Sequence, residues 1–306
     1  MISIKQIRYA LAVEEHGHFR AAADACHISQ PALSGAITEL EKALGFQIFE
    51  RDSKKVLVTP LGDKMLRQAR DIYVAVSDLE SLGTQTTDPL RDPMTIGMIP
   101  TIAPYLLPLV LPRIRTHYPN LKLTVDEDQS HCLVRGVING DLDAAVLALP
   151  YDLGGLLQFS FWDENFYFIA HAQEQIIDSP VIGAGDIDPS RLFLLREGHC
   201  LKDHALAICG LVEEQSINTR GSSLATIIQL VAGKLGTTLI PEIALASLLE
   251  QHPDLAFARL DESGPHRQLA FIIRPNFPRL GEIELLITLF KDALTDYRKK
   301  VLTASR

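Results

Sequence analysis

Two short segments between residues 19 and 44 carry apolar residues three and four positions apart, which is the spacing of one face of an α-helix. These apolar residues are Phe19, Ala22, Ala23 and Cys26 in the first segment, and Leu33, Ile37, Leu40 and Leu44 in the second. Between them, Ser29 can cap the second helix, and Pro31 is tolerated in its first turn because no intrahelical N–H bond is lost there. The pattern therefore predicts a helix-turn-helix, with two surface helices of an ordinary bundle as the plainer alternative.

The face of the second helix opposite its apolar stripe is short, polar and uncharged. Gln30, Ser34 and Thr38 lie on this face, and such side chains can reach base edges or phosphates in a DNA major groove. Downstream, a cluster of basic residues precedes the strand-like run 56–58, which is the pattern of a wing whose charges contact phosphates. The residues predicted to form the DNA-binding surface are Ser29, Gln30, Pro31, Leu33, Ser34, Thr38, Arg51, Lys54 and Lys55.

A longer amphipathic helix is predicted from Pro60 to about residue 82, with Thr59 as its N-cap. Its apolar residues step by three and four positions, close to a heptad seam. They are Leu61, Met65, Ala69, Ile72, Val76 and Leu79. No second helix follows directly to cover this stripe, so we expect it to pair with the same helix of a second copy. Packing onto the N-terminal helix of its own chain is the alternative, and the two arrangements are compatible.

Beyond residue 93 the pattern changes to an alternation of apolar strands and amphipathic helices, which predicts an α/β domain with mostly parallel sheets. Strands are expected at 94–99, 121–127, 143–149, 166–171, 191–195, 236–241 and 268–274, and helices at 103–118, 132–140, 223–233, 242–251 and 282–300. We therefore expect a winged helix-turn-helix domain at 1–59, a linker and dimerisation helix at 60–83, a linker at 84–93 and an effector domain at 94–306.

Charge is divided unevenly along the chain, whose formal net charge is −9. Residues 1–70 hold ten Lys and Arg against eight Asp and Glu, whereas the remaining residues hold nineteen against thirty. A mildly basic head on an acidic body keeps the body away from DNA, and copies that bind together would add their phosphate contacts. No apolar run reaches membrane-spanning length and the N-terminus lacks the order of a signal peptide, so the cytoplasm is the expected compartment.

Four cysteines occur, Cys26, Cys132, Cys200 and Cys209, and a reducing cytosol makes each a free thiol by default. We interpret Cys26 as a packing residue, whereas Cys132 has no assigned role and core packing is its favoured interpretation. Cys200 stands among His and Lys residues, which lower the pKa of a thiol, whereas Cys209 stands in an apolar run and is expected to be buried. An unbroken helix over 200–209 would separate the two by about 13 Å along its axis, but a disulfide needs Cα atoms about 4.4–6.8 Å apart. If both states exist, oxidation must unfold and repack this segment.

The N-terminal segment closely resembles the DNA-binding domain of LysR-type transcriptional regulators. The residues that carry the likeness are Phe19, Ala22, Ala23, Ser29, Gln30, Pro31, Ala32, Leu33, Ser34, Leu40, Glu41, Leu44, Gly45, Phe49, Glu50, Arg51, Thr59, Pro60, Leu61 and Gly62. The resemblance implies an effector domain with two α/β lobes, similar to periplasmic binding proteins. It places lobe I at 94–165 and 267–302 and lobe II at 166–266, with a ligand cleft between them.

The segment around the two C-terminal cysteines is similar to the redox motif of the peroxide-sensing branch of that family, and Gly35 fits the same branch. The matching residues are Gly198, His199, Cys200, Leu201, Asp203, Ala205 and Cys209. The resemblance implies that peroxide reacts with Cys200 and that Cys209 resolves the product. It also implies that Thr101, Ser130, His199, Asp203 and Arg267 hold peroxide or stabilise the thiolate. The family pattern has Thr where this chain has Ser130, which keeps the hydroxyl but not the methyl that restricts its rotamers.

The leading hypothesis is thus a transcription regulator, not an enzyme, that binds operator DNA as a homodimer or homotetramer, senses hydrogen peroxide and controls oxidative-stress genes. Contact with RNA polymerase is possible under it, and activation and repression both remain open. The main alternative is a LysR-type regulator that reads a small metabolite in the cleft. A metal sensor or a thiol enzyme is a third hypothesis, but the spacing of His199, Cys200, His204 and Cys209 matches no standard zinc site, and no cofactor motif is present.

Overall fold

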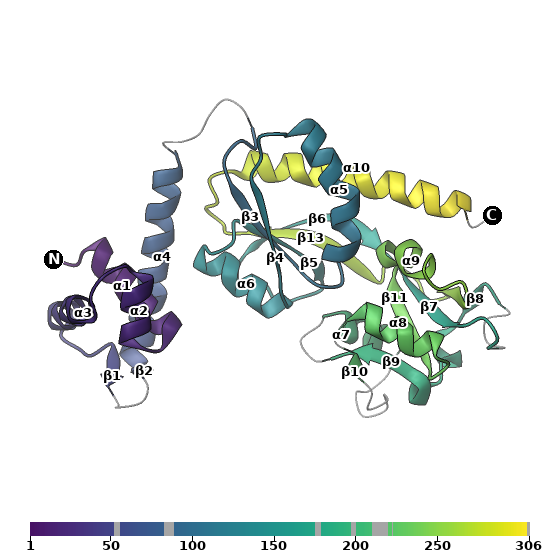
Figure 1. The fold of residues 1–306 in the computed structure, drawn as a ribbon, viewed down its shortest axis with the longest axis horizontal. Helices are drawn as coiled ribbons and strands as arrows, with labels where there is room; N and C mark the ends of the chain where they lie inside the picture. The colour runs from purple at the N-terminus through teal and green to yellow at the C-terminus, as the bar shows by residue number, and fades with distance from the viewer. Residues whose placement is uncertain are drawn as a thin grey trace. The chain divides into compact units, whose positions relative to one another are not determined.

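The computed structural model describes residues 1–51, 56–82, 89–174, 179–196, 200–209, 220–221 and 223–304. The chain divides into two compact units, Met1–Gln85 and Thr86–Arg306. It is a mixed α/β structure, with a helical N-terminal unit and two separate sheets in the C-terminal unit (Figure 1). None of the helices in the described ranges is long and apolar enough to cross a membrane.

The N-terminal unit is built from four helices and a small hairpin in its described part. Its elements are α1 (Ile4–His16), α2 (Phe19–Ala25), α3 (Gln30–Leu44), β1 (Phe49–Arg51), β2 (Val56–Val58) and α4 (Pro60–Leu82). The predicted turn and caps are present: Ser29 accepts a hydrogen bond from the Ala32 amide at the start of α3, and Thr59 accepts one from the Gly62 amide at the start of α4. β1 and β2 pair antiparallel, as the wing requires.

The core of this unit comes from the predicted apolar faces of α2 and α3, joined by residues of α1, β1 and α4. Its buried members are Ala10, Val13, Ala22, Ala23, Leu33, Ile37, Leu40, Ile48, Phe49 and Leu66. Gly62 is essential to this packing, because a side chain there would collide with the Ile48 carbonyl. An ion pair of 2.6 Å between Arg70 and Glu14 ties α4 to α1.

The stripe on α4 therefore has two different environments. Ala69 is buried against the N-terminal unit, whereas Leu61, Ile72 and Leu79 are 54%, 48% and 67% exposed. The alternative of packing onto the chain's own α1 describes part of the helix. The exposed apolar residues remain available for pairing with a second copy, which stays a prediction.

The first sheet of the C-terminal unit has the strand order β4-β3-β5-β13-β6. Its elements are β3 (Met94–Met98), α5 (Ala103–His117), β4 (Leu123–Glu127), α6 (Ser130–Asn139), β5 (Ala144–Leu149), β6 (Leu157–Glu164), β13 (Arg267–Ile273) and α10 (Leu280–Ala304). Helices α5 and α10 pack together, and α10 also contacts β6, while α6 packs on β5 and β13 (Figure 1). The C-terminal part of the chain thus completes a sheet that its first part begins.

The second sheet has the order β10-β9-β11-β7-β12-β8. Its elements are β7 (Phe166–His171), β8 (Val181–Ile182), η2 (Ala184–Asp186), η3 (Pro189–Arg191), β9 (Leu192–Leu195), α7 (Cys200–Cys209), β10 (Arg220–Gly221), α8 (Leu224–Ala232), β11 (Thr237–Pro241), α9 (Glu242–Leu249) and β12 (Leu255–Leu260). The chain passes between the sheets twice, from β6 to β7 and from β12 to β13. Residues 164–166 and 261–267 make these two crossings.

The sheets are more mixed than the alternation of strands and helices predicts. β13 runs antiparallel to β5 and β6, and β7 runs antiparallel to β11 and β12. Both strands follow a direct crossing from the other sheet, without the crossover helix that makes neighbouring strands parallel. The sequence pattern also missed β6 and β12, since both have exposed positions interspersed with buried ones and therefore lack a continuous apolar run.

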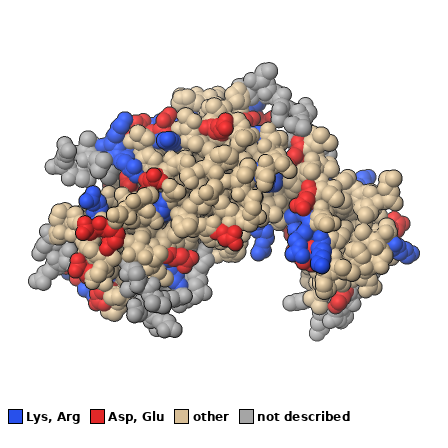
Figure 2. Space-filling model, turned by 180° about the vertical axis from the view of Figure 1, so that it is seen from behind, with Lys and Arg blue, Asp and Glu red and all other residues tan. Residues whose placement is uncertain are grey.

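On the face drawn in Figure 2, Lys and Arg are interspersed with Asp and Glu, and much of the area is uncharged.

Candidate functional site: a buried thiol beside an arginine

Cys200 begins helix α7 and is only 3% exposed. The Ser130 hydroxyl, the Ala148 backbone and the Arg267 guanidinium all lie close enough to favour its charged form. These neighbours come from α6, β5 and β13 of the first sheet, whereas α7 packs on β9 of the second. The thiol therefore lies where the two sheets meet.

The protonation of Cys200 is decided by burial. Burial raises the pKa of the Cys200 thiol, and the positive charge of Arg267 together with the Ser130 and Ala148 contacts only partly opposes this rise. The expectation of a lowered pKa is wrong, because it counted neighbouring cations but not the loss of water around the sulfur. Asp203 is exposed, and its negative charge also raises the pKa of Cys200. The prediction that Asp203 stabilises the thiolate is therefore wrong.

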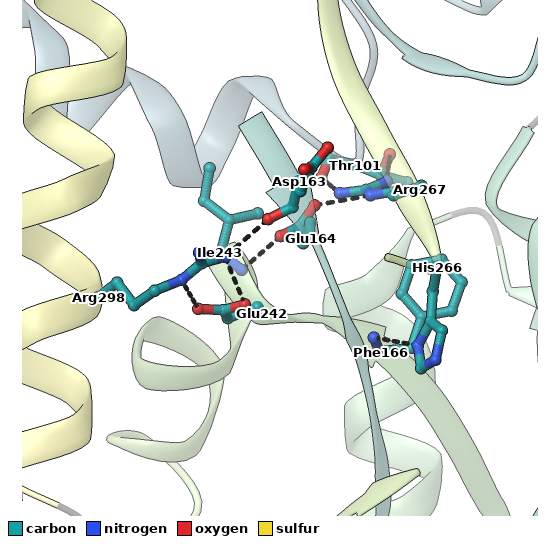
Figure 3. Close-up of polar contacts among 9 residues, drawn as sticks. All are labelled: Thr101, Asp163, Glu164, Phe166, Glu242, Ile243, His266, Arg267 and Arg298. Carbon is teal, nitrogen blue, oxygen red and sulfur yellow. Dashed lines mark hydrogen bonds and ion pairs between the residues drawn. The ribbon is translucent and has the colours of Figure 1, made fainter. Parts of the chain in front are cut away.

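Arg267 is held by two residues that are distant in sequence (Figure 3). Its Nε donates to Glu164 Oε2 at 2.7 Å, its Nη1 donates to Thr101 Oγ1 at 3.2 Å, and its Nη2 donates to the Thr101 carbonyl at 3.4 Å. Arg267 and Thr101 are each 2% exposed and Glu164 is fully buried. The predicted pair Thr101 and Arg267 is thus brought into direct contact, with the Thr101 hydroxyl oriented by the guanidinium.

Ser130 is the first residue of α6 and is 1% exposed. Its hydroxyl is near enough to Cys200 to lower the pKa of the thiol, yet Oγ makes no hydrogen bond of good geometry with any described residue. A buried hydroxyl without a hydrogen-bond partner is costly, so a small polar molecule that bonded to the Ser130 hydroxyl would be bound favourably. Ser130, Thr101, Arg267 and Cys200 together therefore form a compact polar site in an apolar interior.

Two predicted site residues cannot be assessed in this way. His199 and the side chain of Cys209 lie outside the described residues, although the backbone of α7 runs to Cys209. The helix over 200–209 is unbroken, so the two cysteine backbones are about 13 Å apart along its axis. That separation is too long for a disulfide.

The DNA-contacting prediction can be assessed for part of its residues. Ser29, Gln30 and Pro31 are exposed, and Ser34 and Thr38 are half-buried on the same helix. Leu33 is fully buried in the core, so its inclusion among DNA contacts was wrong, because it belongs to the apolar stripe that holds α3 in place. Lys54, Lys55 and the side chain of Arg51 lie outside the described residues.

Comparison with known families identifies both units. Residues 4–63 match the model described as "Bacterial regulatory helix-turn-helix protein, lysR family", and residues 87–295 match the model described as "LysR substrate binding domain". The chain belongs to the LysR family. Each of its two units matches a model of that family.

Individual relatives extend the likeness over nearly the whole chain. The HTH-type transcriptional regulator EstR of Acinetobacter baylyi is 36% identical over 94% of this chain and 96% of its own length. The "Hydrogen peroxide-inducible genes activator" of Pectobacterium carotovorum is 32% identical over 97% of this chain and 98% of its own. Among solved structures, a full-length OxyR variant from Pseudomonas aeruginosa aligns with a TM-score of 0.77 at 30% identity, covering 95% of this chain and 98% of that one.

His204 is a further member of the LysR-family protein's thiol site; it was named from the sequence as a metal-ligand type but was not included among the predicted peroxide-site residues. It lies four residues after Cys200 on α7, is 6% exposed, and its Nε2 lies 3.1 Å from the Pro150 carbonyl. Nε2 must carry the proton to make this bond, so Nδ1 is an acceptor, and it has no partner among the described residues. Burial lowers the pKa of His204, and the nearby Arg267 charge adds to the effect. The helical spacing to Cys200 was the available signal.

Cys26 and Cys132 are not among the main groups that shift the pKa of Cys200. Cys26 is half-buried and packs against the core of the N-terminal unit, as interpreted from its spacing. Cys132 is also half-buried, with its Sγ 3.3 Å from His131 Nε2, and burial raises the pKa of its thiol. Within the described parts of the chain, no group of three or more His, Cys, Asp or Glu residues is arranged to hold a metal ion.

Proposed function

We propose that this LysR-family protein is a cytoplasmic, DNA-binding transcription regulator that senses hydrogen peroxide through Cys200 and Cys209. The observation that carries the proposal is the buried Cys200 thiol beside Arg267 and the unpartnered Ser130 hydroxyl, at the head of a helix that ends at a second cysteine. The name of the Pectobacterium relative, a hydrogen peroxide-inducible genes activator, supports the same function.

The chemistry takes two steps. The Cys200 thiolate attacks one oxygen of hydrogen peroxide, the O–O bond breaks, and the departing hydroxide takes up a proton to leave as water, so that Cys200 becomes a sulfenic acid. The Cys209 thiolate then attacks the Cys200 sulfur and displaces its hydroxyl group as a second water, which leaves a disulfide. Peroxide is reduced by two electrons, and the two thiols together lose two hydrogens.

The polar site around Cys200 serves the first step. Arg267 favours the thiolate, and we assign to the hydroxyls of Thr101 and Ser130 the role of binding a peroxide molecule beside it. Burial keeps the resting thiol protonated, which protects it from unspecific oxidation until a small oxidant enters the site. His199 is proposed to flank the thiol on the basis of the sequence resemblance alone.

The second step carries the signal. Because α7 holds the two cysteine backbones about 13 Å apart along its axis and a disulfide needs Cα atoms within about 6.8 Å, the helix must unwind before Cys209 can reach Cys200. A covalent bond that is incompatible with the reduced fold makes this segment a bistable element. Its rearrangement changes the surfaces that copies of the chain present to one another, and with them the spacing of the DNA-binding units.

DNA recognition is assigned to the start of α3 and to the wing. The exposed Ser29, Gln30 and Pro31 lead into the major groove with Ser34 and Thr38 behind them, while Leu33 supports the helix from the core. Arg51, Lys54 and Lys55 contact phosphates. The exposed apolar residues of α4 pair with a second copy, so that the protein acts as a homodimer or homotetramer, with RNA polymerase as a further partner at the promoter.

The test is whether peroxide acts through Cys200. Cys200→Ser should abolish the change in reporter transcription on peroxide treatment while leaving basal DNA binding intact, whereas the matched variant Cys132→Ser should respond like the wild type. Intact-mass measurement after thiol alkylation should show that wild-type Cys200 and Cys209 lose two hydrogens together.

Intact peroxide induction in Cys200→Ser would overturn the proposal. Thermal stabilisation by a small metabolite, with no change on peroxide treatment, would instead support the alternative of a metabolite-reading regulator.

A further inference from the structure

Glu164 lies at the end of β6, where the chain first passes from one sheet to the other, and it is fully buried. Both of its carboxylate oxygens are used (Figure 3). Oε2 accepts from Arg267 Nε at 2.7 Å, and Oε1 accepts from the Ile243 amide at 2.6 Å, in the first turn of α9. Glu164 thus joins the strand that carries Arg267 to a helix of the second sheet.

Arg267 is a buried cation, and a buried cation requires a negative partner. Its guanidinium lies over the Phe166 ring, with 5.7 Å between Cζ and the ring centroid, and its hydrogen-bond partners are Glu164 and the uncharged Thr101. Two groups near Arg267 can supply the negative charge. One is the Glu164 carboxylate, and the other is the Cys200 sulfur, whose charged form the Arg267 charge favours. The two therefore compete for the same cation.

We propose that Glu164 is a positioning residue that holds Arg267 against Thr101 and competes with the Cys200 thiolate for the Arg267 charge, so that it limits how readily Cys200 reacts. The inference rests on the proposed function for its biological meaning, since the reaction it limits there is oxidation by peroxide. Its physical content concerns the thiol alone and can be tested without peroxide.

The direction of the effect separates this role from a purely structural one. Replacing Glu164 with Gln keeps the size of the side chain but removes the charge, which leaves the Cys200 thiolate as the available counterion for Arg267. The thiolate is then stabilised, and the pKa of Cys200 falls. Loss of a merely structural contact would loosen the site and move Arg267 away from the sulfur, and the pKa of Cys200 would stay unchanged or rise.

The experiment is a pH titration of the thiolate ultraviolet absorbance in the full-length reduced protein, with the Cys200→Ser chain subtracted so that the other thiols cancel. In Glu164→Gln the midpoint should move to lower pH by roughly one unit, equivalent to about a tenfold rise in thiolate at neutral pH. Glu242→Gln is the matched control. Glu242 is buried, precedes Ile243 in α9 and pairs with Arg298. The variant Glu242→Gln therefore removes a buried carboxylate charge without changing a partner of Arg267, and its midpoint should match that of the wild type.

Two further variants keep the inference testable if Glu164→Gln does not fold. Glu164→Asp retains the charge and should leave the midpoint near that of the wild type. The double variant Glu164→Gln with Arg267→Gln removes both charges, and its midpoint should lie above the wild-type value, because no cation remains to favour the thiolate.

A midpoint that is unchanged or raised in Glu164→Gln, or one in the double variant that is as low as predicted for the single variant, overturns the inference. The expected midpoints combined with an absent transcriptional response to peroxide would uphold the inference and overturn the proposed function instead.

Discussion

At the scale of single residues, the site is governed by a balance between burial and one positive charge. Burial disfavours the Cys200 thiolate, and Arg267, itself shared with Glu164, favours it. Burial also raises the pKa of Glu164, while the guanidinium and the Ile243 amide oppose that rise. Reactivity is therefore set by groups more than thirty positions from Cys200 in the chain, and a substitution at any of them changes the thiol without touching it.

His204 gives this residue-scale account a pH signature. Burial lowers the pKa of His204 in the folded protein, whereas in the unfolded chain it takes up a proton near its ordinary value of 6.5. Between these two pKa values the unfolded state binds more protons than the folded state. The contribution of His204 to the free energy of unfolding is therefore full above pH 6.5 and falls as the pH drops through this window. His204→Gln, which can still donate to the Pro150 carbonyl, should lose less stability than the wild type on the same acidification.

The measurement is the free energy of unfolding by denaturant at one pH above and one pH below 6.5. His117 is exposed, so His117→Gln is the control and should retain the full wild-type dependence. An identical pH dependence in His204→Gln and the wild type would mean that His204 is not buried in its neutral form.

At the scale of elements, the proposed function gives the switch and its output to two helices. α7 holds its terminal cysteines apart, and its length of ten residues is what makes the disulfide incompatible with the helix. One side of α4 is anchored by the buried Leu66 and Ala69 and by the ion pair of Arg70 with Glu14 of α1. The other side exposes Leu61, Ile72 and Leu79. A helix with one anchored and one exposed apolar side is suited to joining two copies.

Leu79→Asp tests the role of α4. Leu79 is 67% exposed, so a charge there should leave the fold and thermal midpoint of the isolated chain unchanged, yet it should weaken self-association by about tenfold or more. Sedimentation at several concentrations measures this. Leu235→Asp, at a leucine that is 61% exposed in the other unit, is the matched control and should associate like the wild type. Equal association of Leu79→Asp and the wild type would exclude α4 as the pairing surface.

The elements were more accessible to sequence reasoning than the site. The cap at Ser29, the stripe of Leu33, Ile37 and Leu40, and the Thr59–Pro60 helix start are local patterns, and the structure has them all. Glu164 was not predicted, because its partner Arg267 is 103 positions away and nothing local to Glu164 marks it as buried. The pKa of Cys200 was misjudged for the same reason, since burial depends on which distant segments cover the thiol.

At the scale of the whole molecule, the proposed function divides recognition and sensing between the two units. The N-terminal unit has its own core and presents the α3 surface, while the C-terminal unit contains both sheets and the thiol site between them. The direct crossings at 164–166 and 261–267 bring Glu164 and Arg267 to the boundary of the two sheets. A change at Cys200 therefore begins where the sheets meet, and this is where small rearrangements can shift one lobe against the other.

Amide hydrogen exchange over residues 201–209, measured before and after one equivalent of peroxide, tests the central claim most directly. In the reduced protein these amides should be protected by the α7 hydrogen bonds. After oxidation they should exchange much faster, because the Cys200–Cys209 bond cannot form within the helix, and Cys200→Ser should stay protected throughout. Complete formation of the disulfide with unchanged protection of these amides would contradict the account.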